Sequence, residues 1–193
     1  MIKAIVFDCF GVLIDPIYES FIESVSPETA AKIKKSDQAA DSGQINDKIR
    51  RAEIIKLLDN EGLNGEESLD RAYQTARYNQ RLLDYILELK SRYKTGLLSN
   101  VSDNIWQIFS EQQLGEYFDD CVLSFQVGIT KPQPEIYQLS ADRLELQLNE
   151  CVFVDDKIKN VEAANMVGMH GILYSNFHQF KQDLENVIEV ENA

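Results

Sequence analysis

The sequence has few residues that could cross-link it, and neither a signal peptide nor a membrane span is expected. Its three cysteines, Cys9, Cys121 and Cys151, are odd in number and lie in or beside apolar runs, so we expect buried thiols in a reducing compartment. No basic segment followed by an apolar stretch is present, and no apolar run reaches the roughly 18 residues of a membrane helix. We therefore expect a cytoplasmic protein that does not enter a membrane.

Basic residues are also scarce, because 19 lysines and arginines stand against 32 aspartates and glutamates, for a formal net charge of −13. This balance repels a phosphate backbone, so nucleic acid is not an expected partner. It repels other anions at long range too, so a phosphate site would have to be locally basic. Repeats and low-complexity tracts are absent, and 193 residues, 44% of them hydrophobic, suffice for one domain plus an insertion. We expect a monomer or a homodimer.

The N-terminal stretch is the clearest structural signal in the chain. Of the six residues 2–7, four are large and apolar (Ile2, Ile5, Val6 and Phe7), and this mostly apolar run ends at Asp8. Such a run is typical of a central parallel strand that is covered on both faces. In open α/β sheets, ligands bind outside the carboxyl ends of the strands, so Asp8 is expected at a functional edge.

The remaining chain divides into a helical block and an alternating part. From 15 to 93 the pattern is helical, with a helix start at Ser26-Pro27 and further helices over 43–60, 66–78 and 79–93, of which the first and the last carry an apolar stripe. From 94 onward, strands are expected near 95–98, 121–124, 151–154 and 170–174, with helices over 103–113, 134–146, 157–167 and from 176, fraying after 189. This alternation predicts an α/β fold with a parallel sheet. We expect two domains, a core of 1–14 and 94–193 and a cap of 15–93. The basic residues of the cap are expected to be mostly solvated; they are Lys48, Arg50, Arg51, Arg77 and Arg81.

Four predicted strand ends carry polar groups on one side of this sheet. They are Asp8, Ser99 with Asn100, the Thr130-Lys131 turn, and Asp155 with Asp156. Each alone is an ordinary turn former, helix cap or solvated cation. Together, carboxylates from separate strands can hold Mg²⁺, while a hydroxyl, an amide and an ammonium group hold phosphoryl oxygens. An aspartate can also form a covalent aspartyl-phosphate.

Four segments in this order make the chain similar to the haloacid dehalogenase-like (HAD) hydrolase superfamily over essentially its whole length. They are Phe7-Asp8-Cys9-Phe10-Gly11-Val12-Leu13, Leu98-Ser99-Asn100, Lys131-Pro132-Gln133-Pro134-Glu135-Ile136-Tyr137, and 153–164, which begins Phe153-Val154-Asp155-Asp156. The resemblance implies a Rossmann-like parallel sheet with helices on both faces. It also implies an inserted helical-bundle cap of the subfamily I type, which goes with small phosphorylated substrates.

The resemblance further implies roles for individual residues. Asp8 and Lys131 would be catalytic, with Asp8 the nucleophile. The Mg²⁺ ligands would be Asp8, Asp156 and the backbone carbonyl of Phe10. The phosphate contacts would be Ser99, Asn100 and Lys131, and the supporting residues would be Asp155 and Asn160.

The first motif departs from the family pattern at Phe10. Phosphatases of this superfamily usually carry a second Asp two positions after the nucleophile, and it protonates the leaving oxygen and then activates water. Phe cannot transfer a proton, and a general acid/base contributes about 10²–10⁴-fold in rate. Hydrolysis of ordinary phosphomonoesters is therefore expected to be slow unless another group replaces this acid.

Three functions are consistent with this pattern. The first is a specialised Mg²⁺-dependent phosphatase for a small phosphorylated metabolite, with Asp155 or a cap residue as a substitute proton donor. The second is a non-catalytic relative that binds a phosphorylated ligand or a protein. The third is a 2-haloacid dehalogenase, which also has an aromatic residue at this place, although the acidic pair Asp155-Asp156 fits that metal-free chemistry badly.

Overall fold

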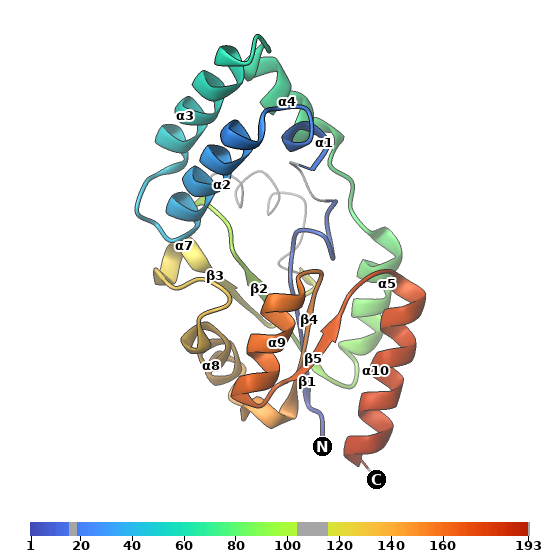
Figure 1. Ribbon diagram of the computed structural model, residues 1–193. Coiled ribbons are helices and arrows are strands. Elements are labelled where there is room, and N and C mark those ends of the chain that lie inside the picture. The colour runs from blue at the N-terminus through green and yellow to red at the C-terminus, as the bar shows by residue number, and fades with distance from the viewer. Residues whose placement is uncertain (16–18, 104–115, 193) are drawn as a thin grey trace.

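A computed structural model describes residues 1–15, 19–103 and 116–192 (Figure 1). It contains one five-stranded sheet in the order β3-β2-β1-β4-β5, in which every neighbouring pair is parallel. The strands are β1 (Ala4–Phe7), β2 (Lys94–Ser99), β3 (Asp120–Leu123), β4 (Cys151–Asp155) and β5 (His170–Leu173). The order reverses at β1, which is typical of Rossmann-like folds, and the predicted α/β class is confirmed.

Helices cover both faces of this sheet because its strands are apolar on both sides. In β1, Ile5 and Phe7 contribute to one cluster of buried side chains, and Ala4 and Val6 contribute to the other. The first cluster lies under α5 (Gln80–Leu89) and α10 (Phe177–Asn192). The second lies under α8 (Pro134–Arg143) and α9 (Ile158–Val167). The continuous apolar run before Asp8 therefore marks the strand at the centre of the fold.

Four more helices of the described residues form a block beyond the carboxyl ends of the strands, at the top of Figure 1. They are α1 (Glu19–Ile22), α2 (Pro27–Asp41), α3 (Asp47–Asn60) and α4 (Gly65–Thr75). The Ser26 hydroxyl accepts a hydrogen bond from the Thr29 N–H, which confirms the predicted start of α2. Buried Ile33, Ile54 and Leu69 join these helices to one another. We call this block the cap.

Several elements differ from the expectations. Helix α5 lies within the predicted cap range of 15–93, but it packs on the sheet because Leu82, Leu83 and Ile86 are buried there. Two short elements, α7 (Ser124–Val127) and a 3₁₀ turn at Leu148–Glu150, were not expected. The last helix continues to Asn192 instead of fraying after 189. The predicted helix over 103–113 lies almost entirely outside the described residues, and the limits of the two domains remain predictions.

The cysteines follow the expectation in part. All three are free; Cys9 and Cys151 are buried, whereas Cys121 is only half-buried. Among the described residues, no helix is both long enough and apolar enough to cross a membrane.

Arg50 of α3 is buried in the cap, with 1% of its side chain exposed, so the expectation that it is solvated is wrong. Its Nε donates to Asp47 Oδ1 at 2.7 Å, its Nη1 to Asp37 Oδ1 at 2.9 Å, and its Nη2 to the Tyr73 hydroxyl at 2.6 Å. Three helices converge on this guanidinium group, and each supplies an acceptor. These charge-assisted hydrogen bonds hold α2, α3 and α4 together inside the cap.

Two contacts join the cap to the core near the strand ends. The Ser102 hydroxyl, just after β2, donates to Asp47 Oδ1 at 3.0 Å, and both residues are buried. At the end of α2, a Cβ built on Gly43 would lie 3.2 Å from the carbonyl oxygen of Phe125 in α7. The C-terminal end of α2 is therefore held against the core.

Candidate active site

Three acidic side chains meet at the carboxyl edge of the sheet. Asp8 directly follows β1, Asp155 ends β4, and Asp156 comes next in the chain. One ligand atom from each lies within 4.8 Å of the other two. The convergence predicted from separate strand ends is therefore present in the structure.

Lys131 places its ammonium group between two of these carboxylates. Its Nζ lies 2.7 Å from Asp8 Oδ1 and 2.8 Å from Asp155 Oδ2, and 1% of the side chain is exposed. Burial alone would lower the pKa of Lys131, but the carboxylates of Asp8 and Asp155 outweigh it and raise the pKa above its usual value. Lys131 is therefore a permanent cation beside Asp8.

Asn100 positions the backbone that carries this lysine. Its Oδ1 accepts a hydrogen bond of 2.8 Å from the Lys131 N–H, and its Nδ2 donates one of 3.0 Å to the Lys131 carbonyl. Both ends of the amide are thus engaged with one residue. The geometry gives Asn100 a positioning role, and its predicted contact with phosphate stays a prediction.

Asp8 is held in an environment that disfavours its charged form. Burial, together with the nearby Asp155 carboxylate, raises the pKa of Asp8 to about 7, although the Lys131 ammonium group opposes the shift. The Cys9 N–H donates to Asp8 Oδ1 at 2.7 Å and fixes the carboxylate. An additional cation at this cluster would favour the ionised form that a nucleophile requires.

Asp155 and Asp156 differ in what surrounds their oxygens. Asp155 accepts hydrogen bonds from Lys131 Nζ, from the Lys157 N–H at 2.8 Å, and from Asn160 Nδ2 at 3.0 and 2.9 Å. In contrast, Asp156 Oδ1 is buried and has no hydrogen-bond partner in the described part of the chain. Such an oxygen beside a second carboxylate suits a hard divalent cation. Asp8 and Asp156 could therefore hold a Mg²⁺ ion. Asp155 instead accepts the hydrogen bonds that fix Lys131 and Asn160.

The absence of a side chain at Gly11 leaves space for the Asp156 carboxylate. Its φ angle is +89°, and an added Cβ would overlap the Asp156 carboxylate. The glycine is thus required both by its backbone conformation and by the close approach of a functional side chain.

The variant Gly11→Ala is expected to lower the free energy of unfolding by more than the roughly 1–2 kcal/mol that a left-handed alanine costs. The additional loss comes from displacing Asp156. Gly62→Ala is the matched control, because Gly62 has a φ of +78° and no atom within 4 Å of its added Cβ. Urea unfolding of both variants measures the difference, and equal losses would contradict the close contact.

Ser99 is at the expected strand end, but it does not line the cleft. It is fully buried, and its hydroxyl has no hydrogen-bond partner among the described residues. The nearby hydroxyl of Ser124, which sequence reasoning missed, accepts a hydrogen bond of 2.9 Å from the Val101 N–H and so fixes the loop after β2. An unsatisfied buried hydroxyl at this edge is compatible with the predicted phosphate contact.

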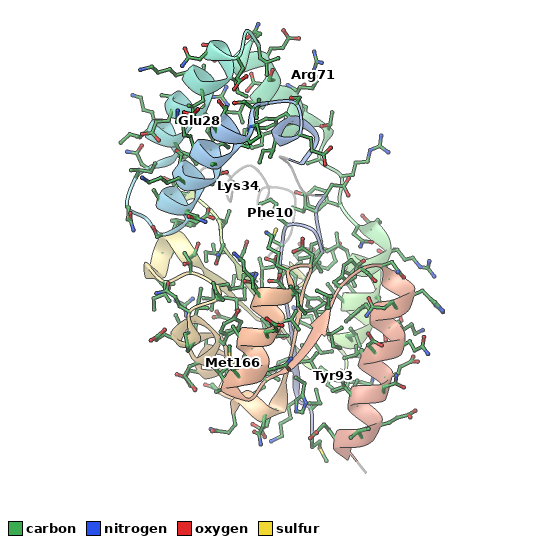
Figure 2. The ribbon with its side chains drawn as sticks, viewed as in Figure 1. Phe10, Glu28, Lys34, Arg71, Tyr93 and Met166 are labelled. Atoms are coloured by element: carbon green, nitrogen blue, oxygen red, sulfur yellow. The ribbon has the colours of Figure 1, made fainter. Side chains whose placement is uncertain are left out.

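A cleft of about 350 Å³ separates this edge from the cap. Figure 2 shows Phe10 in the loop after β1 and Lys34 on α2 where the two parts meet. Its core side is lined by Asp8, Phe10, Asn100, Lys131, Lys157, Lys159 and Asn160, and its cap side by Lys34, Asp37, Gln38 and Asp41. This lining includes four lysines but also three aspartates, so the cleft has mixed charge and not the locally basic character that was expected. The α2 residues were not predicted, although their spacing of three and four places them on one helical face.

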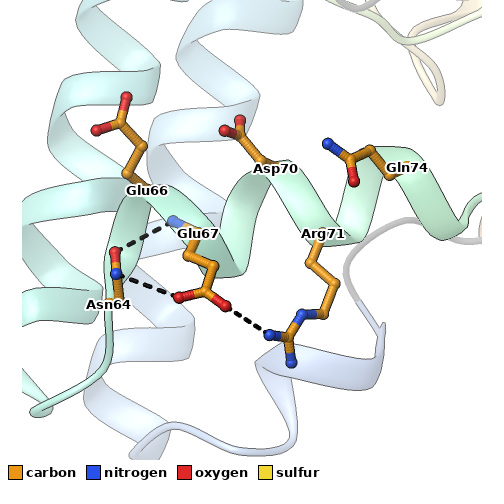
Figure 3. A pocket seen from close by; sticks show the side chains of 6 residues that line it. All are labelled: Asn64, Glu66, Glu67, Asp70, Arg71 and Gln74. Carbon is orange, nitrogen blue, oxygen red and sulfur yellow. Dashed lines mark hydrogen bonds and ion pairs between the residues drawn. The ribbon is translucent and has the colours of Figure 1, made fainter.

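A second hollow, of about 440 Å³, lies along α4 in the cap (Figure 3). Its polar side chains largely bind one another, because Arg71 donates to Glu67 at 2.7 Å and Asn64 donates to Glu67 at 3.3 Å. It contains none of the strand-end residues. The candidate active site is therefore the cleft above Asp8.

The fold and the site together define a class: Rossmann-like α/β enzymes with a carboxylate centre at the edge of a parallel sheet, beneath an inserted cap. A sequence profile described as haloacid dehalogenase-like hydrolase matches residues 2–168. The chain belongs to this family and is a hydrolase. The cluster of Asp8, Asp155 and Asp156 could hold a metal ion.

Individual relatives span nearly the whole chain. It is 29% identical to a D-ribitol-5-phosphate phosphatase of Bacteroides thetaiotaomicron, over 97% of this chain and 99% of that protein. It is 26% identical to an (S)-2-haloacid dehalogenase 4A of Burkholderia cepacia, over 89% and 82%. A crystal structure of a HAD family enzyme of Bacteroides thetaiotaomicron, in complex with magnesium and inorganic phosphate, is similar with a TM-score of 0.73. It is 23% identical and covers 91% of this chain and 95% of its own, which supports the fold.

Proposed function

We propose that the protein is a cytoplasmic, Mg²⁺-dependent phosphatase that hydrolyses a small phosphorylated metabolite through an aspartyl-phosphate on Asp8. The observation that carries the proposal is the cluster of Asp8, Asp155 and Asp156 around Lys131, with one oxygen of Asp156 left without a partner. The likeness to a ribitol-phosphate phosphatase along nearly the whole chain supports phosphate as the group removed.

Each residue of the site has a distinct task in this proposal. Asp8, Asp156 and the backbone carbonyl of Phe10 hold Mg²⁺, which when bound screens the repulsion between a carboxylate nucleophile and a phosphate anion. Lys131 carries the positive charge that attracts the phosphoryl oxygens, and Ser99 offers a hydroxyl to them. Asp155, Asn100 and Asn160 keep Lys131 and its surroundings in place.

The cap sets the size of the substrate. We propose that the segment inserted into a core of 1–14 and 94–193 comprises 15–93, and that its helices α1–α4 form a cap of the subfamily I type that closes over this core, while its last helix, α5, covers the sheet. The cleft of about 350 Å³ is small enough to favour a metabolite over a phosphorylated protein. Its lining of carboxylates, amides and lysines suits a polar substrate.

A second candidate function is a metal-free 2-haloacid dehalogenase. Phe10 lines the cleft beside Asp8, and the likeness to a 2-haloacid dehalogenase covers most of the chain. Asp156 argues against it, because a metal-free site would leave a buried carboxylate oxygen without a partner. The phosphatase accounts for more of the observed residues.

One assay series separates these functions. The purified protein is given p-nitrophenyl phosphate, acetyl phosphate or 2-chloropropionate, with Mg²⁺ or with a chelator. We expect phosphate release that requires Mg²⁺ and no release of chloride. Chloride release that persists in chelator would establish the dehalogenase instead, and a complete lack of turnover of all three compounds would overturn the proposed hydrolysis.

A further inference from the structure

The cleft contains one carboxylate that the proposed chemistry does not yet use. Two acidic side chains of α2, Asp37 and Asp41, line the cleft opposite Asp8. Asp37 is committed to Arg50, whose Nη1 donates to it at 2.9 Å. Asp41 accepts no hydrogen bond and forms no ion pair with any residue in 1–15, 19–103 or 116–192. Of the two cap carboxylates that line the cleft, Asp41 is therefore the one that remains available to a bound molecule.

The position of Asp41 relative to the core is fixed at the end of its helix. Asp41 is the last residue of α2, and two residues later Gly43 lies against the carbonyl of Phe125. The hydrogen bond from Ser102 to Asp47 holds the following segment to the loop after β2. These contacts hold the side of the cleft that carries Asp41 against the core that carries Asp8.

The surroundings of Asp41 favour a carboxyl group that exchanges its proton near neutral pH. Burial raises its pKa to about 7 and the like charge of Asp37 adds to the shift, while Arg50, Lys157 and Lys131 oppose it. The C-terminal end of a helix is also the negative end of its dipole, which disfavours a carboxylate there. A group with such a pKa both gives and takes protons efficiently.

We propose that Asp41 is the general acid and base of the hydrolysis, in the place of the acid that Phe10 cannot supply. This inference rests on the proposed phosphatase function. The Asp8 carboxylate attacks phosphorus, and the bond to the leaving oxygen breaks with its electron pair on that oxygen. Asp41 gives its proton to the same oxygen and becomes a carboxylate. It then takes a proton from water as that water attacks the aspartyl-phosphate, which returns an electron pair to Asp8 and releases phosphate.

The test compares two leaving groups. The p-nitrophenolate anion is stable and leaves without a proton, whereas phenolate is a poorer leaving group and needs one. In Asp41→Asn, we expect kcat/KM for phenyl phosphate to fall by about 10²–10⁴-fold and kcat/KM for p-nitrophenyl phosphate to fall by less than about tenfold. Because water activation is also lost, rapid mixing of this variant with p-nitrophenyl phosphate should give a burst of p-nitrophenol followed by slow turnover.

Three further variants make the result specific. Asp37→Asn, which changes the neighbouring cleft carboxylate, should keep the wild-type ratio of the two rates. Asp41→Glu retains a carboxyl group and should recover much of the activity on phenyl phosphate. Phe10→Asp restores an acid in the first motif, and it should raise the activity of Asp41→Asn far more than that of the wild type.

Two results would overturn the role of Asp41, and they are distinguishable from a failure of the phosphatase itself. If a folded Asp41→Asn lowers kcat/KM for both substrates by the same factor, or for neither, then Asp41 is not the proton donor. If the wild-type protein with Mg²⁺ releases phosphate from neither substrate, the proposed function fails and the role of Asp41 fails with it. The thermal unfolding midpoint of each variant confirms that a folded protein is compared.

Discussion

The variant Asp8→Asn is expected to lower Mg²⁺-dependent phosphate release by roughly 10⁴–10⁶-fold, the loss found when a covalent nucleophile is removed. The amide nitrogen and oxygen of Asn cannot replace the carboxylate in forming an acyl phosphate. The fold should persist, because Asn has nearly the same shape and its substitution removes one of three crowded carboxylates. Phosphate release and the unfolding midpoint, measured in the same buffer, check both expectations.

Asp15→Asn is the matched control for this variant. Asp15 lies in the same loop after β1, but it is exposed and does not line the cleft. Its replacement should leave phosphate release unchanged. Acid quenching with radiolabelled substrate should trap label on the wild type and not on Asp8→Asn. More than about 1% residual activity in Asp8→Asn would rule out Asp8 as the nucleophile.

The variant Arg50→Ala is expected to lower the free energy of unfolding by about 3–5 kcal/mol, the usual cost of removing one partner of a buried ion pair. It would leave Asp37 and Asp47 without the guanidinium group that satisfies them at 2.9 and 2.7 Å. It would also leave a void where α2, α3 and α4 meet. Urea unfolding followed by the helical circular dichroism signal measures this change.

The neighbouring Arg51→Ala provides the control on the same helix. Arg51 pairs with Asp70 at 2.7 Å, but its side chain is 27% exposed and the Asp70 side chain is 49% exposed. Pairs at such surface positions contribute about 0–1 kcal/mol. Losses of equal size in the two variants would show that burial does not decide the strength of the Arg50 network.

Much of the core and its functional edge follows from local sequence patterns. The apolar run before Asp8 specifies a central strand, and the alternation of strands and helices after 94 specifies parallel pairing. Since parallel strands end at the same edge, Asp8, Lys131, Asp155 and Asp156 were expected to meet there, and they do. Asp8, Asp155 and Asp156 are predictable because each lies at or directly after the end of its own strand, whereas Lys131 lies in the turn between α7 and α8.

The cap side of the cleft does not follow from such patterns. Whether Asp41 lines the same cleft as Asp8 depends on how α2 is placed over the sheet, and that placement results from long-range contacts such as Ser102 with Asp47. The burial of Arg50 depends on three helices meeting, although a cap arginine is normally solvated. Helix α5 has the same periodicity as a cap helix, and only its partners show that it covers the sheet.

Asp47 Oδ1 links the cap to the core at a point outside the cleft. This oxygen serves Arg50 within the cap and Ser102 beside the loop that carries Ser99 and Asn100. Lifting this part of the cap from the core would break the hydrogen bond from Ser102 to Asp47 and expose the buried Asp47 and Arg50 side chains to water. Separation of the cap from the core is therefore opposed by a buried, charged contact that lies outside the cleft itself.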